Sequence, residues 1–303
     1  MAAPQGPSPI AYMERTRSYY EALGYGPPYR WAHHAEVPFA PLPGPLRSLT
    51  VGLVTTAAPY KADAGDQGPG APYNAAAKFY AVYAVPSDTM PDLRISHVAI
   101  DRDHTTAEDI GTYLPLRALW GAAAGGRIGR LARRLYGLPT NRSQKTTTDV
   151  DAPALLEACR ADGVEAAVLV ANCPVCHQSV SLAARALETA GIPTVIMGAA
   201  RDIVEHAGVP RLLFSDVPLG NAAGLPGDTT SQDATLARAL DLLETATAPR
   251  TTALNPIQWP GPTDWRESYS NAARLSREEV AARRAAFDDG KRVAAGLRKT
   301  GGG

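Results

Sequence analysis

Two cysteines in the stretch ANCPVCHQSV, residues 171–180, have the spacing of a reactive or metal-binding pair. Cys173 and Cys176 are separated by two residues, and His177 follows directly. A Cys-x-x-Cys-His pattern is typical of three kinds of site: covalent haem attachment, half of a zinc site, and a redox-active or nucleophilic thiol pair. Inert structural cysteines are a fourth possibility. The secondary structure around the motif has to discriminate between them.

The second half of the chain alternates between helical and strand patterns. Each expected strand is a continuous apolar run, as in a parallel sheet that is covered by helices on both faces. The sequence therefore predicts an α/β fold with a doubly wound parallel sheet, flavodoxin- or Rossmann-like, with right-handed crossovers. The expected helices cover 152–161, 177–190, 201–207 and 231–247, and the expected strands cover 165–171, 193–197 and 211–214.

The cysteine motif lies where one of these strands gives way to a helix. Cys173 follows the strand directly and Cys176 sits at the start of the helix, with Pro174 suited to the first helical turn. Ligands of open α/β sheets bind at the carboxyl ends of the strands. The N-terminus of a helix favours a thiolate, so that cysteine pKa values fall from about 8.5 to roughly 3.5–7.5 in such places. This position favours a reactive thiol pair.

The other interpretations of the motif have less support. Haem attachment needs a distal ligand and an exported helical protein. A zinc site needs further soft ligands, but Cys159 lies on an upstream helix, where we expect a small buried residue, and no second Cys-x-x-Cys exists. Cys176 and His177 are adjacent, and adjacent residues rarely bind one ion together. We therefore expect no metal site.

The remaining sequence divides into three further parts. A helix after Ser8-Pro9 and an extended Pro-rich arm occupy 1–47, and a helical tail occupies 255–303. Between the arm and the half at 149–254, residues 48–148 read as another α/β half. It has strands at 49–54 and 93–100 and then helices, with 127–134 as the solvated face of one of them.

Composition excludes several functional classes. Thirty basic side chains balance thirty acidic ones, which argues against a nucleic acid or an anionic membrane surface as the main partner. No apolar run approaches the roughly 18 residues of a membrane span. The N-terminus lacks a charged region followed by an apolar one, so we expect a cytoplasmic protein. Three cysteines in 303 residues do not suggest a disulfide framework.

Longer stretches around the motif resemble a known family. They are VLVANCPVCHQSVSLAARALETAGIPTVIMG, DIVEHAGVPRLLFSDVPLGNAAGLPGD and, upstream, DLRISHVAIDRDH. This sequence resembles the selenoprotein B family of glycine, sarcosine and betaine reductases, and more closely the selenoprotein subunit of D-proline reductase. The spacing from the motif to AGIP at 190–193, and PLGN at 218–221, agree with the family. The resemblance covers at least residues 50–250.

The resemblance implies a chemistry and a set of partners. It places Cys173 on the selenocysteine position of the family and Cys176 on its cysteine partner. It implies reductive cleavage of a C–N bond, with the chalcogen bond later reduced by a dithiol donor. In D-proline reductase a separate subunit carries a pyruvoyl group. Sulfur replaces selenium here, and a Cys173–Cys176 disulfide would be reducible by a thioredoxin-like donor.

We therefore expect an oxidoreductase, a thiol-dependent reductase that acts on a small amine or an amino-acid-like molecule. Cys173 is the expected nucleophile, Cys176 the resolving thiol, and His177 either helps to deprotonate a thiol or faces solvent. We expect no cofactor bound by this chain, a possible pyruvoyl group on a partner subunit, and a homo-oligomer. The alternatives are a cysteine-nucleophile enzyme of specialised metabolism without net reduction, and a non-catalytic scaffold subunit of a reductase complex.

Several polar residues follow strands or fall in the upstream motif, and we expect them to line the substrate site. Three of these residues are candidates for general acid or substrate-orienting work, with loop and capping roles as the alternative. Those three are His97, Asp101 and His104. The other expected substrate-binding residues are Thr55, Thr56, Asn172, Asp216 and Asn221.

Overall fold

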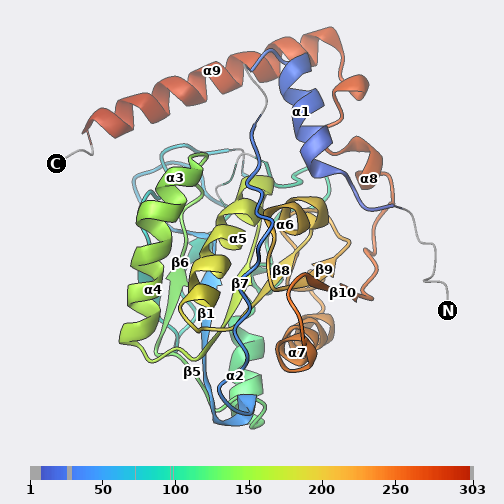
Figure 1. Ribbon diagram of the computed structural model, residues 1–303. Helices are drawn as coiled ribbons and strands as arrows, with labels where there is room; N and C mark the ends of the chain where they lie inside the picture. The colour runs from blue at the N-terminus through green and yellow to red at the C-terminus, as the bar shows by residue number, and fades with distance from the viewer. Residues whose placement is uncertain (1–7, 26–28, 72, 96, 98, 301–303) are drawn as a thin grey trace.

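A computed structural model describes residues 8–25, 29–71, 73–95, 97 and 99–300, and its centre is an eight-stranded sheet (Figure 1). The strands follow the order β10-β9-β8-β7-β1-β6-β3, and β5 pairs with β1 beside β6. All pairings are parallel except that of β3 with β6. The strands are β1 Thr50–Thr55, β3 Tyr83–Pro86, β5 Arg130–Leu131, β6 Arg134–Gly137, β7 Ala166–Val170, β8 Thr194–Gly198, β9 Arg211–Ser215 and β10 Thr251–Asn255. A separate antiparallel pair joins β2, Ala58–Pro59, to β4, Leu93–Arg94.

Helices cover both faces of the sheet, which confirms the predicted α/β fold class. Successive strand residues point to opposite faces, so Leu53 and Val168 pack with the helices of one face, and Val54 and Leu169 pack with those of the other. The first face carries α2, Leu116–Ala124, and α7, Thr229–Thr245; the second carries α4, Ala152–Ala161, α5, Pro174–Thr189, and α6, Arg201–Ala207.

The strand order creates a switch point in the middle of the sheet. The chain runs from β1 outward to β6 and then crosses back over β1 to β7, after which β8, β9 and β10 follow in sequence. This β6-β1-β7-β8-β9 order is the 2-1-3-4-5 order of flavodoxin-like sheets, whose ligands bind where the winding reverses. The reversal lies between β1 and β7, so the two predicted α/β halves, 48–148 and 149–254, contribute to one continuous sheet.

Both terminal segments pack against the body of the molecule. Helix α1, Tyr12–Ala22, lies with α8, Trp265–Ser268, and α9, Arg277–Thr300, at one end of it (Figure 1). The expected helix start at Ser8-Pro9 was too early. After α1 the arm runs extended across α5, where the N–H of Ala32 donates to the side chain of Gln178 at 2.6 Å. The remaining short helices are η1 Leu46–Ser48, η2 Ile110–Thr112, α3 Gln144–Thr146, which continues through a π turn at Thr147–Asp151 into α4, and η4 Ala272–Arg274.

Two further predictions of secondary structure were wrong, and one strand was missed. Residues 127–134 do not form a solvated helix face, because β5 and the start of β6 lie there. Strand β6 ends at Gly137, where a Cβ would collide with the ring of Tyr83 on β3. The close pairing of β6 with β3 therefore requires glycine at this position. Of the described residues in the expected strand at 93–100, only Leu93–Arg94 form a strand, β4. The edge strand β10 was not predicted at all.

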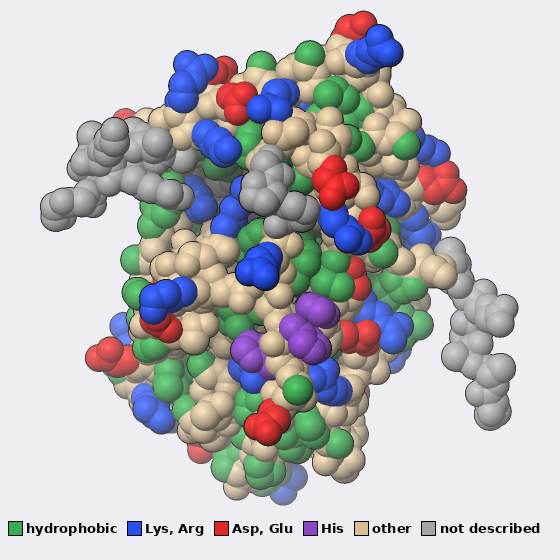
Figure 2. Space-filling view, turned by 45° about the horizontal axis from the view of Figure 1, so that its top comes forward, with side chains coloured by type: hydrophobic (Ala, Val, Ile, Leu, Met, Phe, Trp, Pro, Cys, Tyr) green, Lys and Arg blue, Asp and Glu red, His purple; other side chains and the backbone are tan. Residues whose placement is uncertain are grey.

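The surface agrees with the balanced composition. On the face shown in Figure 2, acidic and basic side chains are interspersed, and neither sign of charge forms a continuous patch. Within the described part of the chain, no helix combines the length and the apolar character that crossing a membrane requires.

Candidate active site

The cysteine pair lies at the start of α5, immediately after β7 and beside the switch point. Cys173 is the N-cap residue of α5, and its Sγ atom accepts a hydrogen bond from the backbone N–H of Cys176 at 3.2 Å. Pro174 occupies the first helical position, which suits its fixed φ. The thiol pair therefore lies at a strand-to-helix turn, where the sequence predicts it. Cys173 caps the helix, and Cys176 lies in its first turn.

The two sulfur atoms are in direct contact and nearly enclosed. The Sγ atoms of Cys173 and Cys176 lie 2.6 Å apart, and both thiols are free. Cys173 is 3% exposed and Cys176 is 0% exposed. A small molecule that reaches the pair therefore meets Cys173 first.

The surroundings of the pair shift the pKa values of the two cysteines in opposite directions. Burial raises the pKa of Cys173, and the neighbouring Cys176 raises it further. Burial also opposes ionisation of Cys176, but the Cys173 thiol, His97 and Thr140 together outweigh that cost and hold the pKa of Cys176 below its usual value. The sequence predicts Cys173, the expected nucleophile, as the thiolate; the surroundings instead favour a Cys173 thiol beside a Cys176 thiolate.

Two residues from other segments flank Cys176. The Oγ1 atom of Thr140, just after β6, lies 3.3 Å from the Sγ atom of Cys176. A ring nitrogen of His97 lies within 4.8 Å of both sulfur atoms. His97 is one of the residues that the sequence predicts to bind substrate, whereas Thr140 was not predicted. The only signal for Thr140 was its place after a buried strand that had been read as helix.

His177 has a different environment from the one expected. Its Nδ1 atom lies 2.7 Å from the backbone oxygen of Cys173, and its Nε2 atom accepts from the N–H groups of Ala199 and Ala200 at 2.9 and 3.0 Å. Because Nε2 accepts, Nδ1 must carry the proton and donate, so the ring is neutral. Burial lowers the pKa of His177 to about 4. Both nitrogens are occupied by backbone groups, so His177 neither faces solvent nor deprotonates a thiol: it joins the start of α5 to the end of β8.

The residues at the switch point form a buried polar bridge. Asn172 donates from its Nδ2 atom to the Oγ1 atom of Thr56 at 3.0 Å, which links the ends of β7 and β1. The hydroxyl of Thr55 accepts from the N–H of Ala57 at 3.1 Å. The Oδ1 atom of Asn172 is buried and has no hydrogen-bond partner among the described residues. Of this group, Asn172, which precedes Cys173 in the chain, therefore has an unpaired acceptor.

The upstream motif forms a second polar cluster. The Nδ1 atom of His104 lies 2.8 Å from the carboxylate of Asp101, whose pKa is raised by burial. Thr105 donates to the Oδ1 atom of Asn221 at 3.4 Å, so Asn221 fixes the same loop. Asp216, in contrast, forms an ion pair with Arg266 of the C-terminal segment at 2.8 Å. Asp101, His104 and Asn221 therefore lie in one cluster, whereas the carboxylate of Asp216 is paired with Arg266 outside it.

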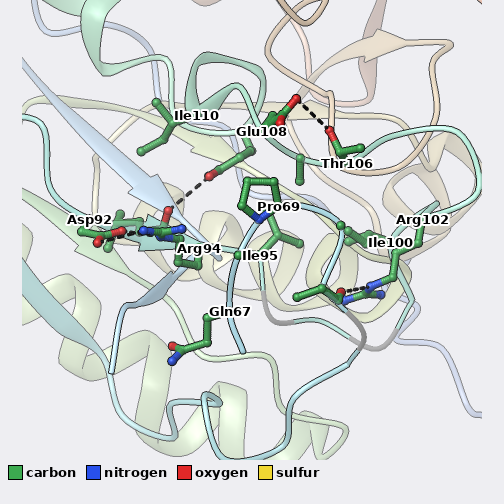
Figure 3. A pocket seen from close by; sticks show the side chains of 16 residues that line it. Gln67, Pro69, Asp92, Arg94, Ile95, Ile100, Arg102, Thr106, Glu108 and Ile110 are labelled. Carbon is green, nitrogen blue, oxygen red and sulfur yellow. Dashed lines mark hydrogen bonds and ion pairs between the residues drawn. The ribbon is translucent and has the colours of Figure 1, made fainter. Parts of the chain in front are cut away.

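A cavity of about 260 Å³ lies between the Gly-rich loop at 67–71 and the upstream motif (Figure 3). Its apolar wall includes Ile95, Ile100 and Ala107, which belong to or pack against the same hydrophobic cluster as the two cysteines. Arg102 also lines the cavity, where its Nε atom donates to the backbone oxygen of Ala71 at 2.8 Å (Figure 3). Cys173 acts electrostatically on Arg102, but neither cysteine is among the residues that line this cavity.

Comparison with known proteins decides the family. The chain is 31% identical over 199 residues to D-proline reductase subunit gamma of Acetoanaerobium sticklandii, an alignment that covers 65% of this chain and 78% of that protein. The chain belongs to the family of proline and glycine reductase selenoprotein subunits. No protein-family profile and no solved structure matches it.

Membership of the reductase family gives the chain a general role. The homologue is a subunit of a reductase, so a role related to a reductase complex follows for this chain. The family resemblance expected from the sequence is confirmed. In this family member, the described thiol pair lies at the sheet's switch point, with Cys173 and Cys176 in contact.

Proposed function

We propose that this chain is a thiol-dependent reductase subunit that cleaves a C–N bond of a small amine or an amino-acid-like substrate. One observation carries the proposal: two free cysteine sulfurs lie 2.6 Å apart at the switch point of the sheet, in a chain of the proline and glycine reductase family. A dithiol that closes to a disulfide supplies two electrons, which is what reductive cleavage of one bond requires.

Cys173 is the nucleophile in the proposed first step. It is the more exposed residue of the pair, and its sulfur is in direct contact with the sulfur of Cys176. The Cys173 sulfur attacks the carbon that bears the nitrogen, and its proton passes to Cys176 as the C–S bond forms, so that no Cys173 thiolate has to precede the attack. A C–S bond forms, the C–N bond breaks, and the nitrogen leaves with the electron pair and takes a proton from water.

Cys176 is the resolving thiol in the second step. It loses its proton and attacks the sulfur of Cys173, so that the S–S bond forms and the C–S bond breaks. The carbon keeps the electron pair and takes the proton that Cys176 gives up. The substrate has then gained two electrons and two protons, and the disulfide is reduced by a thioredoxin-like dithiol donor, which is oxidised in turn.

Two polar features of the upstream motif and the switch point support a small, polar substrate. The cavity of about 260 Å³, which neither cysteine lines, has Arg102 next to an apolar wall, a combination suited to a carboxylate on a short hydrocarbon frame. Asn172 offers an unpaired Oδ1 acceptor for an ammonium or amide N–H. Activation of the amine by a pyruvoyl group on a partner subunit is part of the proposal, because the homologue is one subunit of D-proline reductase.

A single-turnover experiment tests the proposed function. The reduced chain, freed of external thiols, is incubated with D-proline and a panel of small amines, with and without a pyruvoyl-bearing subunit. Mass spectrometry then measures the cleaved product and the Cys173–Cys176 disulfide. We expect one disulfide for each product molecule in the wild type and in Cys159→Ala, a matched control because Cys159 is free but lies away from the site on α4.

Variants of the pair discriminate between the functional classes. Cys173→Ser and Cys176→Ser should each abolish product formation. Loss with Cys173→Ser alone would instead indicate nucleophilic catalysis without net reduction. Unchanged activity in both variants would leave the scaffold role and overturn the proposal.

A further inference from the structure

Three metal-ligating side chains converge at the start of α5. One ring nitrogen of His97 and the Sγ atoms of Cys173 and Cys176 all lie within 4.8 Å of one another. No other group of three or more such ligands occurs in the described part of the chain. No metal site was predicted from the sequence, and His177, the histidine next to the cysteines, is not a ligand here because both of its nitrogens are held by backbone groups. His97 supplies the missing ligand from a distant loop.

The spacing suits a thiophilic ion. Zinc binds cysteine sulfur at about 2.3 Å and histidine nitrogen at about 2.0–2.1 Å, so a tetrahedral site needs its ligand atoms roughly 3.6–3.8 Å apart. The nitrogen-to-sulfur distances are already within 4.8 Å. The two sulfurs, at 2.6 Å, have to separate by about 1.2 Å, which a change in cysteine side-chain rotamer supplies.

Two further features fit an ion at this place. The Nδ1 atom of His97 is buried and has no hydrogen-bond partner among the described residues. Buried polar atoms are normally paired, so this nitrogen has bonding capacity that the described residues leave unused, while the His97 side chain already interacts with the Cys176 thiol. Thr140 lies within hydrogen-bonding distance of the sulfur of Cys176 and would orient that ligand.

We propose that His97, Cys173 and Cys176 form a Cys₂His site for a thiophilic divalent cation such as Zn²⁺. Three protein ligands leave a fourth position open, as in catalytic rather than structural zinc sites. Binding releases the remaining thiol protons and holds both sulfurs as thiolates. The ion and the Cys173–Cys176 disulfide exclude each other, and only this part of the inference rests on the proposed function. The ion would protect the reduced pair and inhibit the reductase.

Metal titration tests the site without any substrate. The reduced full-length chain, stripped with a chelator, is titrated with Zn²⁺ and, for its absorption spectrum, with Co²⁺. We expect one ion per chain, a thiolate-to-cobalt charge-transfer band, and protection of Cys173 and Cys176 from alkylation that a chelator reverses. If the wild type binds less than one ion per chain, or if Zn²⁺ does not change the alkylation of Cys173 and Cys176, the inference is overturned without the need for any variant.

Variants separate the metal site from the redox pair. His97→Ala should weaken Zn²⁺ binding by roughly 100-fold or more while the disulfide still forms with an added oxidant. His33→Ala, which changes an exposed histidine of the arm, is the matched control and should bind Zn²⁺ like the wild type. Undiminished binding by His97→Ala contradicts the proposed ligand set. A chain that binds Zn²⁺ but never forms the disulfide would refute the redox proposal and leave the metal site standing.

Discussion

Helix α5 has a buried polar group at each end, and the two ends differ in how their groups are paired. At the C-terminal end the carboxylate of Glu188 accepts from Arg211 at 2.9 Å, from the Thr194 hydroxyl at 2.8 Å, and from the backbone N–H groups of Thr194 and Ala40. At the N-terminal end the sulfur atoms of Cys173 and Cys176 contact each other. The sulfur of Cys173 also accepts from the backbone N–H of Cys176, and the sulfur of Cys176 also pairs with the hydroxyl of Thr140.

The carboxylate of Glu188 at one end of α5 has several hydrogen-bond partners that hold the fold together, whereas some polar atoms at the cysteine end have none among the described residues. Burial raises the pKa of Glu188, so its many partners offset the cost of removing the carboxylate from water rather than exceed it. That end of α5 holds the arm, β8 and β9 together. At the other end, the Nδ1 atom of His97 and the Oδ1 atom of Asn172 have no hydrogen-bond partner among the described residues. A bound molecule or ion can use such unpaired polar atoms.

The largest expected effect on stability comes from breaking the paired end. Glu188→Ala leaves the guanidinium of Arg211 buried without a carboxylate and several donors without an acceptor. We expect the free energy of unfolding to fall by about 3–5 kcal/mol, measured by urea denaturation. Thr189→Ala, an exposed site on the same helix, is the control and should change it by less than about 0.5 kcal/mol. Equal losses in the two variants would remove the contrast between the ends of α5.

A smaller effect is expected at a carboxylate with fewer partners. Asp202, near the start of α6, accepts from the N–H of Met13 at 2.8 Å, and burial raises the pKa of Asp202 to about 6. The folded state therefore binds a proton more tightly than the unfolded state does. Relative to Asp202→Asn, the wild type should lose on the order of 2 kcal/mol of stability as the pH rises from about 4 to about 7. A stability difference that does not vary with pH would show that this carboxyl has an ordinary pKa.

The smallest effect on stability is expected at the cysteine end. Serine is a good N-cap residue, so Cys173→Ser keeps the hydrogen bond to the first turn of α5. We expect the free energy of unfolding to stay within about 1 kcal/mol of the wild type while the redox function is lost. A collapse of stability in Cys173→Ser would mean that the cysteines serve structure as Glu188 does.

Much of the sheet could be predicted because its signals are local. The apolar runs that form β7, β8 and β9 are short, continuous and bounded by turns, and Pro174 marks the start of α5. Ligand position then follows from topology, since carboxyl ends of parallel strands lie at one edge. Strands β5 and β6 were read as helix because the same leucine spacing fits a helical face, and only pairing with β1 and β3 decides between the two.

The contents of the site were harder to predict because they depend on contacts between distant segments. His177 is adjacent to Cys176 in sequence, yet its ring turns toward β8, where Gly198 leaves room for it. His97 approaches both sulfurs from a loop beyond β4, and Thr140 does so from beyond β6. Sequence spacing identified the cysteine pair, but it could not identify which histidine lies beside both sulfurs.

Trapping with glutathione disulfide tests most directly which sulfur reacts and which resolves. The reduced wild type, Cys173→Ser and Cys176→Ser are each exposed to it, and the modified cysteines are located by mass spectrometry. We predict an intramolecular Cys173–Cys176 disulfide in the wild type, a stable glutathione adduct on Cys173 in Cys176→Ser, and little or no adduct on the enclosed Cys176 in Cys173→Ser. A wild-type pair that stays reduced, or an adduct that forms as fast on Cys176 as on Cys173, would contradict the account.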